Sequence, residues 1–401
     1  MLGMAHALWK AAAMKITSVT PILCDGGFRP WTFIKITTDD GVIGYGDCSD
    51  WGNAPAVAAC VEGLAPLVVG QDPANIEAIW WTLYKKTIRA IGGIAHKAMS
   101  GINAALWDIK GKRLGAPVYD LLGGRVRERL RLYWSHCGVT RARYHEVTHT
   151  PPVRSMEDLG RLAEEVAERG FTAIKTNLFH PGEPKGGLLG LLEGTISAAS
   201  LRHAEMLAGT FRQHGGADLG IALDVGFRFD VSSATRLAQA LEPYRLMWLE
   251  VENLDPRALK EVKMSTRTPI CTGESLYQTH GFRPYLEDHA VDIIMPDIAW
   301  NGISMGRKIA DLADCFGIMV APHNCHSPLT TLITAHLCMA IKNFMILEFD
   351  QDDVPWRDAV LTHPLDVREG HLYLSDRPGF GADLDESEIA CHPFRAIPEA
   401  F

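Results

Sequence analysis

The sequence predicts an α/β protein built around a (β/α)8-type barrel, preceded by an antiparallel sheet and a group of helices. Three observations predict this fold. The first part of the chain alternates apolar and polar residues and then changes to a helical period. The later part carries eight short apolar runs separated by helical stretches. Three of these runs end in an acidic residue at nearly even spacing, which predicts neighbouring parallel strands.

Residues 14–48 are predicted to form three strands. ITSVTPIL, WTFIKITT and VIGYGDC favour β-structure, and an Asp-Asp-Gly turn joins the second run to the third. The segment CDGGFRP is predicted to be a mobile loop between the first two. From Pro55 the apolar spacing becomes three and four, which predicts helices over 56–70, 73–86 and 94–115. We therefore expect an antiparallel sheet followed by a helical bundle.

The eight barrel strands are predicted between residues 130 and 348. Helical stretches such as 155–170 and 232–244 separate them, which is the alternation of a parallel α/β barrel. The strand ranges are 130–137, 171–177, 219–224, 246–250, 269–273, 291–296, 317–322 and 344–348. The longest gap, 180–200, is glycine-rich and predicts an insertion over the active-site face. Residues 358–401 lose the alternation, so we expect this tail to complete the first domain.

Composition argues against several partners and locations. The chain has 39 basic and 48 acidic residues, a formal net charge of −9, so no nucleic-acid or membrane-surface partner is expected. No apolar run approaches the ~18–20 residues of a transmembrane helix. Nine cysteines without a C-x-x-C pair favour free thiols in the cytoplasm. Residues 1–13 lack the features of a secretory signal, and we interpret them as an extra segment before the fold begins at Met14.

Three carboxylates are predicted to converge on the carboxyl-terminal face of the barrel. Asp224, Glu250 and Glu274 end successive strands, 26 and 24 positions apart, which is about one β/α unit. Barrel enzymes place their chemistry at this face. Three hard oxygen ligands with open positions for substrate are typical of Mg²⁺. One such acid alone is usually an ordinary strand-end or N-cap residue, but three in phase favour a metal site, which would also admit an anionic substrate.

The other strand ends supply predicted catalytic and binding groups. Lys175 and Asn177 share one face of the second strand. An interior lysine needs an anionic partner such as a substrate carboxylate, unless it extends to the rim. Asp297 and His323 end the sixth and seventh strands, so the carboxylate would orient the imidazole as a general base. Glu348 ends the eighth strand and is predicted to hydrogen-bond a substrate oxygen, or else to be a buried acid paired with a basic neighbour.

Several residues near the barrel mouth are candidates for substrate contact. His136 and Arg228 follow strand ends, and Asn177 ends the second strand. All three are predicted to bind substrate. Trp51 is predicted to reach over the mouth, as is Trp31, although either residue would equally suit packing within the first domain. His326 completes an H-x-x-H spacing with His323, which is weak as a metal motif, and we expect it at the rim.

This ordered set of residues resembles the enolase superfamily, specifically the mandelate racemase/muconate lactonizing enzyme family and its mandelate racemase subgroup. The resemblance runs from Met14 to the C-terminus and includes LWDIKGKRLGAPVYDLLGG, which is similar to the family's helix-to-linker segment. It implies a modified (β/α)7β barrel over 131–357 and an α+β capping domain from 14–130 and 358–401. It also implies Mg²⁺, removal of the proton α to a carboxylate, and a homo-oligomer from dimer to octamer.

Two departures from the family pattern bear on the reaction. Asn177 replaces the second lysine of the K-x-K motif and cannot take a proton, whereas a racemase needs a base on each face of its substrate. The insertion after the second strand is instead similar to acid-sugar dehydratases. Galactonate dehydratase-like members read D-F-H-G-R at the first metal ligand, and this chain reads DVGFR from Asp224 to Arg228. Gly226 replaces the catalytic histidine, which argues against galactonate or mannonate as substrate.

We therefore predict a Mg²⁺-dependent dehydratase, a hydro-lyase acting on a sugar acid that is an aldonate or an aldarate. His323, oriented by Asp297, would abstract the C2 proton, and loss of the 3-hydroxyl would give a 2-keto-3-deoxy acid. Protonated His323 could then act as the acid in a syn elimination, assisted by Tyr133, His136 or Arg228. The alternatives are an epimerase, racemase or cycloisomerase of the same superfamily, and a metal-binding barrel without catalysis.

Overall fold

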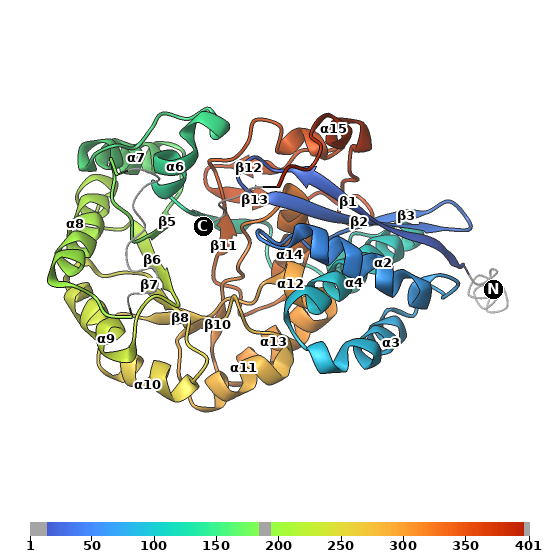
Figure 1. Cartoon of the computed structure of the whole chain (residues 1–401), viewed down its shortest axis with the longest axis horizontal. Coiled ribbons are helices and arrows are strands. Elements are labelled where there is room, and N and C mark those ends of the chain that lie inside the picture. Colours follow the sequence, from blue (N-terminus) through green and yellow to red (C-terminus); the bar gives the residue numbers. More distant parts are fainter. Residues whose placement is uncertain (1–13, 184–193, 397–401) are drawn as a thin grey trace.

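The computed structural model describes residues 14–183 and 194–396 and shows two parts that lie side by side (Figure 1). A barrel ringed by helices forms one part, and a small sheet with its helices forms the other. Residues 1–13, predicted as an extra segment, and residues 184–193 of the predicted insertion lie outside the described residues.

The N-terminal part is a three-stranded antiparallel sheet followed by three helices, as predicted. The strands pair in chain order and are β1 (Ile16–Asp25), β2 (Pro30–Thr38) and β3 (Ile43–Asp47). The helices are α2 (Ala54–Val68), α3 (Ile76–Thr87) and α4 (Gly93–Leu114). Each helix starts within three residues of its predicted start, because the change of apolar period marks the point where the chain leaves the sheet.

The segment CDGGFRP is a tight, largely buried hairpin and not the mobile loop that was predicted. β1 and β2 pair as far as Asp25 and Pro30, which leaves only a short turn between them. A Cβ atom on Gly26 would lie 2.2 Å from the carbonyl oxygen of Arg29, and Gly27 has a φ of 81°, so both positions favour glycine. The two glycines signalled a chain reversal, whereas the burial comes from residues distant in sequence.

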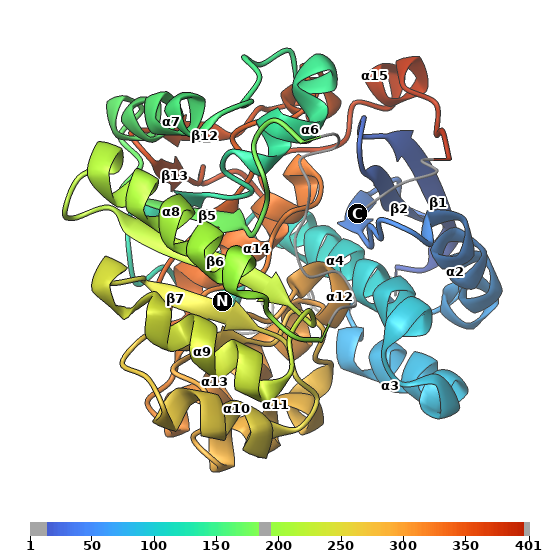
Figure 2. The ribbon, with the colours of Figure 1, turned by 60° about the vertical axis from the view of Figure 1, so that its left-hand side comes forward.

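Helix α4 connects the small sheet to the barrel. β3 approaches the helix so closely that a Cβ atom on Gly46 would lie only 2.0 Å from the carbonyl oxygen of Gly101, so this position requires glycine. Elsewhere on the same helix, the hydroxyl of Ser100 donates to the carbonyl of Ile298 at 3.0 Å. Ile298 begins α12 (Ile298–Asn301) of the barrel, so these contacts hold the two parts together (Figure 2).

Eight parallel strands form the barrel, and all eight were predicted. They are β4 (Leu130–Trp134), β5 (Ala173–Asn177), β6 (Gly220–Gly226), β7 (Trp248–Val251), β8 (Ile270–Thr272), β9 (Ile293–Ile294), β10 (Met319–Val320) and β11 (Leu347–Phe349). Neighbouring strands pair in parallel from β4 to β10, and β11 pairs with β4. A parallel bridge between Val320 and Phe344 closes the ring.

Helices surround the strands on the outside of the barrel (Figure 1). Those between successive strands are α7 (Met156–Glu168), α8 (Ala198–Gly215), α9 (Val231–Ala240), α10 (Pro256–Met264), α11 (Gln278–Glu287), α13 (Ile303–Cys315) and α14 (Pro328–Ala340). Two further helices, α5 (Val118–Leu121) and α6 (Val139–Thr148), flank β4. After β11 the described chain enters the 3-10 turn η4 (Asp358–Val360), and no α-helix directly follows this eighth strand, which gives the (β/α)7β arrangement.

Local sequence fixes where several barrel helices begin. Ser155, Ser197, Asp230 and Asp255 each accept a hydrogen bond from a backbone N–H in the first turn of α7, α8, α9 and α10. These caps set the ends of the loops that follow the strands. The site-bearing loops therefore run between a strand end and a capped helix.

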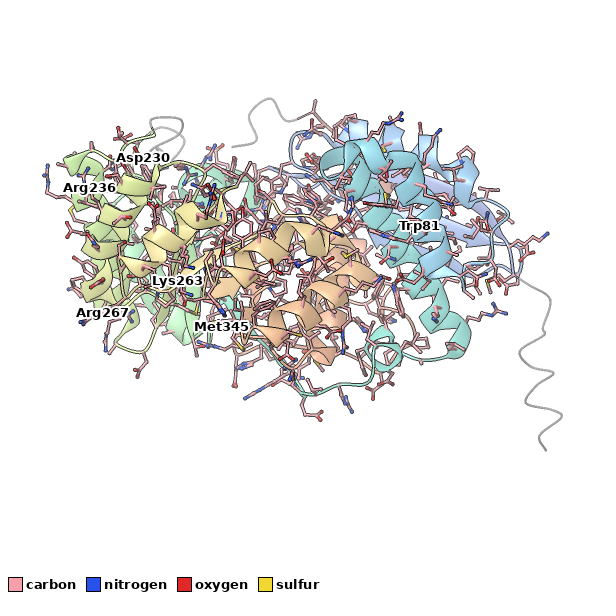
Figure 3. The ribbon with its side chains drawn as sticks, turned by 90° about the horizontal axis from the view of Figure 1, so that it is seen from below. Trp81, Asp230, Arg236, Lys263, Arg267 and Met345 are labelled. Carbon is pink, nitrogen blue, oxygen red and sulfur yellow. The ribbon has the colours of Figure 1, made fainter. Side chains whose placement is uncertain are left out.

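Side chains fill the barrel interior, so it is a packed core and not a pore. Tyr133 and Trp248 are fully buried there with ring centroids 5.5 Å apart, beside small residues such as Ala222. In Figure 3, Asp230, which follows β6, and Met345, which precedes β11, lie at opposite edges of the barrel. The predicted site belongs to the end where the strands finish.

The C-terminal tail packs first on the barrel and then on the small sheet. β12 (Asp366–Arg368) and β13 (His371–Tyr373) form a hairpin, and β13 pairs antiparallel with β4. Beyond it, α15 (Glu386–Cys391) contacts β3, where the hydroxyl of Tyr45 donates to Glu386 at 2.6 Å. The expected return of the tail to the first part is therefore seen for α15, whereas the hairpin extends the barrel sheet.

Two expectations from the composition can be compared with the structure. Within the described ranges, no helix combines the length and the apolar character needed to cross a membrane. All nine cysteines are unpaired thiols, as their number and spacing predicted.

His336 on α14 leads to a prediction about acid stability. Its ring is fully buried, Nδ1 accepts from the backbone N–H of Tyr119 at 3.1 Å, and burial lowers the pKa of the imidazole to about 4. This pKa lies below the unfolded value of about 6.5, so neutral His336 stabilises the folded protein above pH ~6.5. Its contribution to the free energy of unfolding, roughly 3 kcal/mol, is lost as the pH falls to about 4. Urea unfolding of His336→Gln should show a smaller loss of stability than wild type over this range. An equal loss in both proteins would contradict the claim that protonation of His336 causes this loss of stability.

Candidate active site

Three acidic side chains lie at the ends of three neighbouring strands, as their spacing predicted. Asp224 on β6 pairs in register with Glu250 on β7, and Glu274 follows β8. The amide of Asn177 donates to one oxygen of Asp224 at 2.7 Å, and the backbone N–H of Gly226 donates to the other at 2.8 Å. These two donors fix the orientation of the Asp224 carboxylate.

The acids carry more negative charge than the nearby cations balance. Burial and repulsion from Asp224 and Glu274 raise the pKa of Glu250 well above its usual range, although Lys175 opposes this. Burial also raises the pKa of Glu274, with His323 opposing. A divalent cation held among these oxygens would relieve the repulsion, and hard oxygen donors suit Mg²⁺. The donor set therefore fits the metal that the resemblance implied.

Lys175 is buried in the barrel between two acids. Its Nζ lies 3.3 Å from Oε2 of Glu250 and 2.8 Å from Oε1 of Glu348. Burial lowers the pKa of the lysine, but these two carboxylates raise it well above its ordinary value. Lys175 is therefore an interior cation and not a lysine extended to the rim. The neighbouring Thr176 points away and donates to the carbonyl of Cys137 at 2.7 Å, as strand alternation predicts.

Glu348 is an ionised acceptor in this site. Besides Lys175, it accepts from the hydroxyl of Ser135 and from the backbone N–H of Asn324, the latter at 2.8 Å. Burial alone would raise its pKa, but Lys175 and two nearby histidines lower it to about 2. The alternative of a buried acid with a basic partner is thus the one seen. The hydrogen bond from Glu348 to a substrate oxygen stays a prediction.

Asp297 and His323 form the predicted pair beside the ends of β9 and β10. Nδ1 of the imidazole donates to Oδ2 of Asp297 at 2.6 Å, and both side chains are buried. Burial opposes the ionisation of Asp297, but His326 and His323 lower its pKa. Because the carboxylate holds the proton on Nδ1, Nε2 is the basic atom. Oε2 of Glu274 lies 3.4 Å from Nε2, and Sγ of Cys325 lies 3.0 Å from it.

His326 is buried beside this pair. The prediction that it lies at the rim is therefore wrong. Its Nε2 lies 2.7 Å from the same Oδ2 of Asp297, and the other oxygen of Asp297 accepts the N–H of Trp300 at 2.9 Å. His323, Cys325 and His326 could bring ligand atoms within 4.8 Å of one another. Asp297 contacts one nitrogen of each histidine, which fixes the orientation of both rings.

A cavity of about 340 Å³ joins these groups at the barrel mouth. Its lining residues are Trp51, His136, Lys175, Asn177, Asp224, Gly226, Phe227, Arg228, Glu274 and His323. Four residues predicted to contact substrate therefore lie around one space with the base His323 and two of the three predicted acids, Asp224 and Glu274. These four are Trp51, His136, Asn177 and Arg228. Trp31 does not join them, because it is 1% exposed and packs against Phe33 in the small sheet.

The N-terminal part supplies one wall of the cavity. The ring of Trp51 lies 6.2 Å from that of His323, and the guanidinium of Arg29 lies 5.4 Å from the centre of the Trp51 ring. Arg29, at the β1–β2 turn, is buried in an ion pair with Asp350. Sequence reasoning missed this pair because its members are 321 positions apart. The one available signal was that Asp350 follows Glu348 by two residues.

Glu252 is a further buried acid that sequence reasoning missed. Its carboxylate accepts from the hydroxyl of Thr272 at 2.8 Å and from the backbone N–H of Gly273 at 2.7 Å. Burial, with Glu274 adding to it, raises the pKa of Glu252 to about 8. The contacts fix the backbone immediately before Glu274. The alternation Glu250, Glu252 in the sequence was the signal that could have found it.

Comparisons with known proteins agree with this geometry. The family model "Enolase C-terminal domain-like" matches residues 158–388, and "Mandelate racemase / muconate lactonizing enzyme, N-terminal domain" matches residues 26–123. D-xylonate dehydratase of Haloferax volcanii is 34% identical over 385 residues, covering 94% of this chain and 89% of the relative. D-mannonate dehydratase Caul1427 of Caulobacter sp. is 30% identical, with 93% of each chain covered.

Solved structures agree as well. A Burkholderia xenovorans protein, provisionally assigned as an L-alanine-DL-glutamate epimerase and bound to magnesium and fumarate, aligns with a TM-score of 0.90 at 34% identity. The alignment covers 94% of this chain and 96% of that one.

Proposed function

Because the chain belongs to the mandelate racemase/muconate lactonizing enzyme family of the enolase superfamily, as its motifs predicted, we propose that it is a Mg²⁺-dependent sugar-acid dehydratase. The substrate class is an aldonate or an aldarate. The observation that carries the proposal is the Asp297–His323 pair, whose imidazole lines one cavity with Lys175 and the strand-end acids Asp224 and Glu274. The third strand-end acid, Glu250, contacts Lys175 at 3.3 Å. Relatives named for the dehydration of D-xylonate and D-mannonate support the reaction class.

The chain's own groups divide the work of removing the C2 proton. A proton α to a carboxylate is weakly acidic, so the enediolate must be stabilised as it forms. Lys175, held as a cation, supplies positive charge to the developing oxyanion. Mg²⁺ held by Asp224, Glu250 and Glu274 would, when bound, add Lewis-acid stabilisation of the same charge.

His323 is the base in this scheme. Nε2 takes the C2 proton, while Asp297 keeps the other proton on Nδ1 and stabilises the imidazolium that forms. The 3-hydroxyl leaves as water, and the enol that remains tautomerises to the 2-keto-3-deoxy acid. His326 and Trp300 act as positioning residues, because each of them donates to the Asp297 carboxylate.

The site offers less support for an epimerase. Asn177 stands where a second base would be needed, and its amide donates to Asp224. Lys175 is held between two acids, which favours its role as a cation over a role as a base. Gly226 has a φ of 49°, which suits glycine, and its N–H holds Asp224. That position therefore contributes a backbone contact where related dehydratases carry a histidine.

A substrate screen tests the proposal. The protein with Mg²⁺ is incubated with stereoisomeric aldonates and aldarates, beginning with D-xylonate and D-mannonate, and 2-keto-3-deoxy product is detected with semicarbazide. We expect at least one acid to give product, EDTA to stop turnover, and added Mg²⁺ to restore it. Absence of product from every acid would contradict the function, and turnover that resists EDTA would contradict the metal.

A pair of variants refines the test of the metal site. Glu250→Gln removes one of the three proposed ligand charges and should raise the Mg²⁺ concentration needed for half-maximal activity. Glu261→Gln makes the same change on the exposed surface of α10 and should leave that concentration unchanged. Equal Mg²⁺ dependence in the two variants would remove Glu250 from the proposed ligand set.

A further inference from the structure

A second carboxylate–histidine pair lines the same cavity. His136 lies just beyond β4, and its Nδ1 is 2.8 Å from Oδ1 of Asp350, just beyond β11. The two side chains are only 6% and 5% exposed, and His136 is one of the residues that line the cavity. The arrangement repeats that of Asp297 and His323, and only β11 lies between the two strands that lead to the histidines.

The backbone holds His136 in an uncommon conformation. Its φ is 46°, in the left-handed region that residues other than glycine seldom adopt. The residues on both sides are tied to adjacent strands: the N–H of Ser135 donates to the carbonyl of Phe349 at 2.8 Å, and the N–H of Cys137 donates to the carbonyl of Lys175 at 2.9 Å. Strain of this kind persists where surrounding structure fixes it, often at functional sites.

Asp350 sets the tautomer of His136. Arg29 of the N-terminal part pairs with the other oxygen of Asp350, so the carboxylate is flanked by a fixed cation and by the imidazole. The Asp350 carboxylate, 2.8 Å from Nδ1, favours a proton on that nitrogen, because it is closer than the Arg29 N–H donor at 3.3 Å. Nε2 is then the ring nitrogen left to exchange a proton with a substrate.

We propose that His136 is the general acid that protonates the departing 3-hydroxyl, with Asp350 and Arg29 as its positioning residues. This inference rests on the proposed dehydratase function, which requires both a base and an acid. Asn177 and Gly226 supply no acid, whereas His136 faces the same cavity as the base.

The proton balance of this step closes without another reactant. His323 Nε2 takes the proton from C2, and the electrons of the C2–H bond move into the carboxylate group to give the enediolate. These electrons then form the C2–C3 double bond as the C3–O bond breaks. The proton on Nε2 of charged His136 passes to the departing oxygen, so water leaves. Solvent then returns a proton to His136 and removes one from His323.

The test compares His136→Asn with a matched control, His149→Asn. His149 also has a positive φ, 51°, but lies exposed at the end of α6, and asparagine tolerates this backbone conformation well. The assays use the sugar acid that wild type dehydrates and its 3-deoxy-3-fluoro analogue. Fluoride leaves with much less need for protonation than hydroxide. The readouts are product formation, fluoride release and exchange of the C2 proton in D₂O.

We expect His136→Asn to form product about 10²–10⁴-fold more slowly than wild type. C2 exchange and fluoride release should continue in this variant, and the control should match wild type in all three readouts. A purely structural role would reduce all three together in His136→Asn and would overturn the inference. So would dehydration at the wild-type rate, which would leave His323 as the acid.

Two further comparisons keep the outcome decisive. A wild-type protein that dehydrates no sugar acid would remove the proposed function and this inference with it, a result distinct from failure of the variant alone. If His136→Asn does not fold, as judged by circular dichroism, His136→Gln is put through the same three assays with the same expected pattern.

Discussion

Replacement of His323 by asparagine is expected to lower the rate of dehydration by about 10²–10⁴-fold. Nε2 of His323 is the atom that takes the C2 proton, because Asp297 holds the proton on Nδ1. Asparagine preserves a polar group next to Asp297 but cannot accept a proton. C2 exchange in D₂O should fall together with product formation, since both depend on the same proton removal. This pattern distinguishes the base, His323, from the acid, His136, because loss of His136 should leave C2 exchange unchanged.

Steady-state rates and proton NMR in D₂O measure the two effects of the His323 change. His280→Asn, the same substitution on the exposed surface of α11, serves as the matched control and should behave as wild type. Full dehydration by His323→Asn would assign the base to another group. Loss of product with unchanged C2 exchange would also contradict the account.

Replacement of Lys175 by methionine is expected to lower kcat by about 10²–10³-fold, the effect of removing one preorganised stabilising group. Methionine approximates the buried length of lysine without its charge, so the loss reports on electrostatics more than on packing. Lys112→Met is the control: that lysine pairs with Asp108 in the N-terminal part and should cost stability without changing kcat. Similar kcat losses in both variants would contradict the role of Lys175.

The same Lys175 substitution has a predicted effect on stability in metal-free protein. Lys175 is the main group that lowers the pKa of Glu348 to about 2. With an unfolded pKa of about 4.3, Glu348 contributes roughly 3 kcal/mol that is present above pH ~4.3 and lost as the pH falls towards 2. Urea unfolding of EDTA-treated Lys175→Met should show a deficit against wild type at pH 7 that shrinks between pH 4.3 and 2. A deficit independent of pH would contradict this origin.

The parts of the site that follow from local rules could be predicted from the sequence. Side chains at the ends of parallel barrel strands share one face, so spacing alone placed Asp224, Glu250 and Glu274 together. The same rule placed His323 next to Asp297. Alternation along one strand correctly put Lys175 inside the barrel and turned its neighbour away.

Contacts between distant segments and protonation states could not be predicted in this way. Arg29 reaches Asp350 across 321 positions, and no periodicity connects them. His326 turns inward because Asp297 can accept from two imidazoles, a choice that depends on three-dimensional packing. The ionisation of Glu348 depends on its buried partner, which only the assembled barrel defines.

The measurement that tests the central claim most directly follows the C2 proton in wild-type protein. Each acid of the screen is incubated with protein and Mg²⁺ in D₂O, and substrate and product are examined by proton NMR. The account predicts a 2-keto-3-deoxy acid that has lost its C2 proton and carries one deuterium at C3 from tautomerisation. Deuterium at C2 of recovered, inverted substrate, with no keto acid formed, would contradict the account and identify an epimerase.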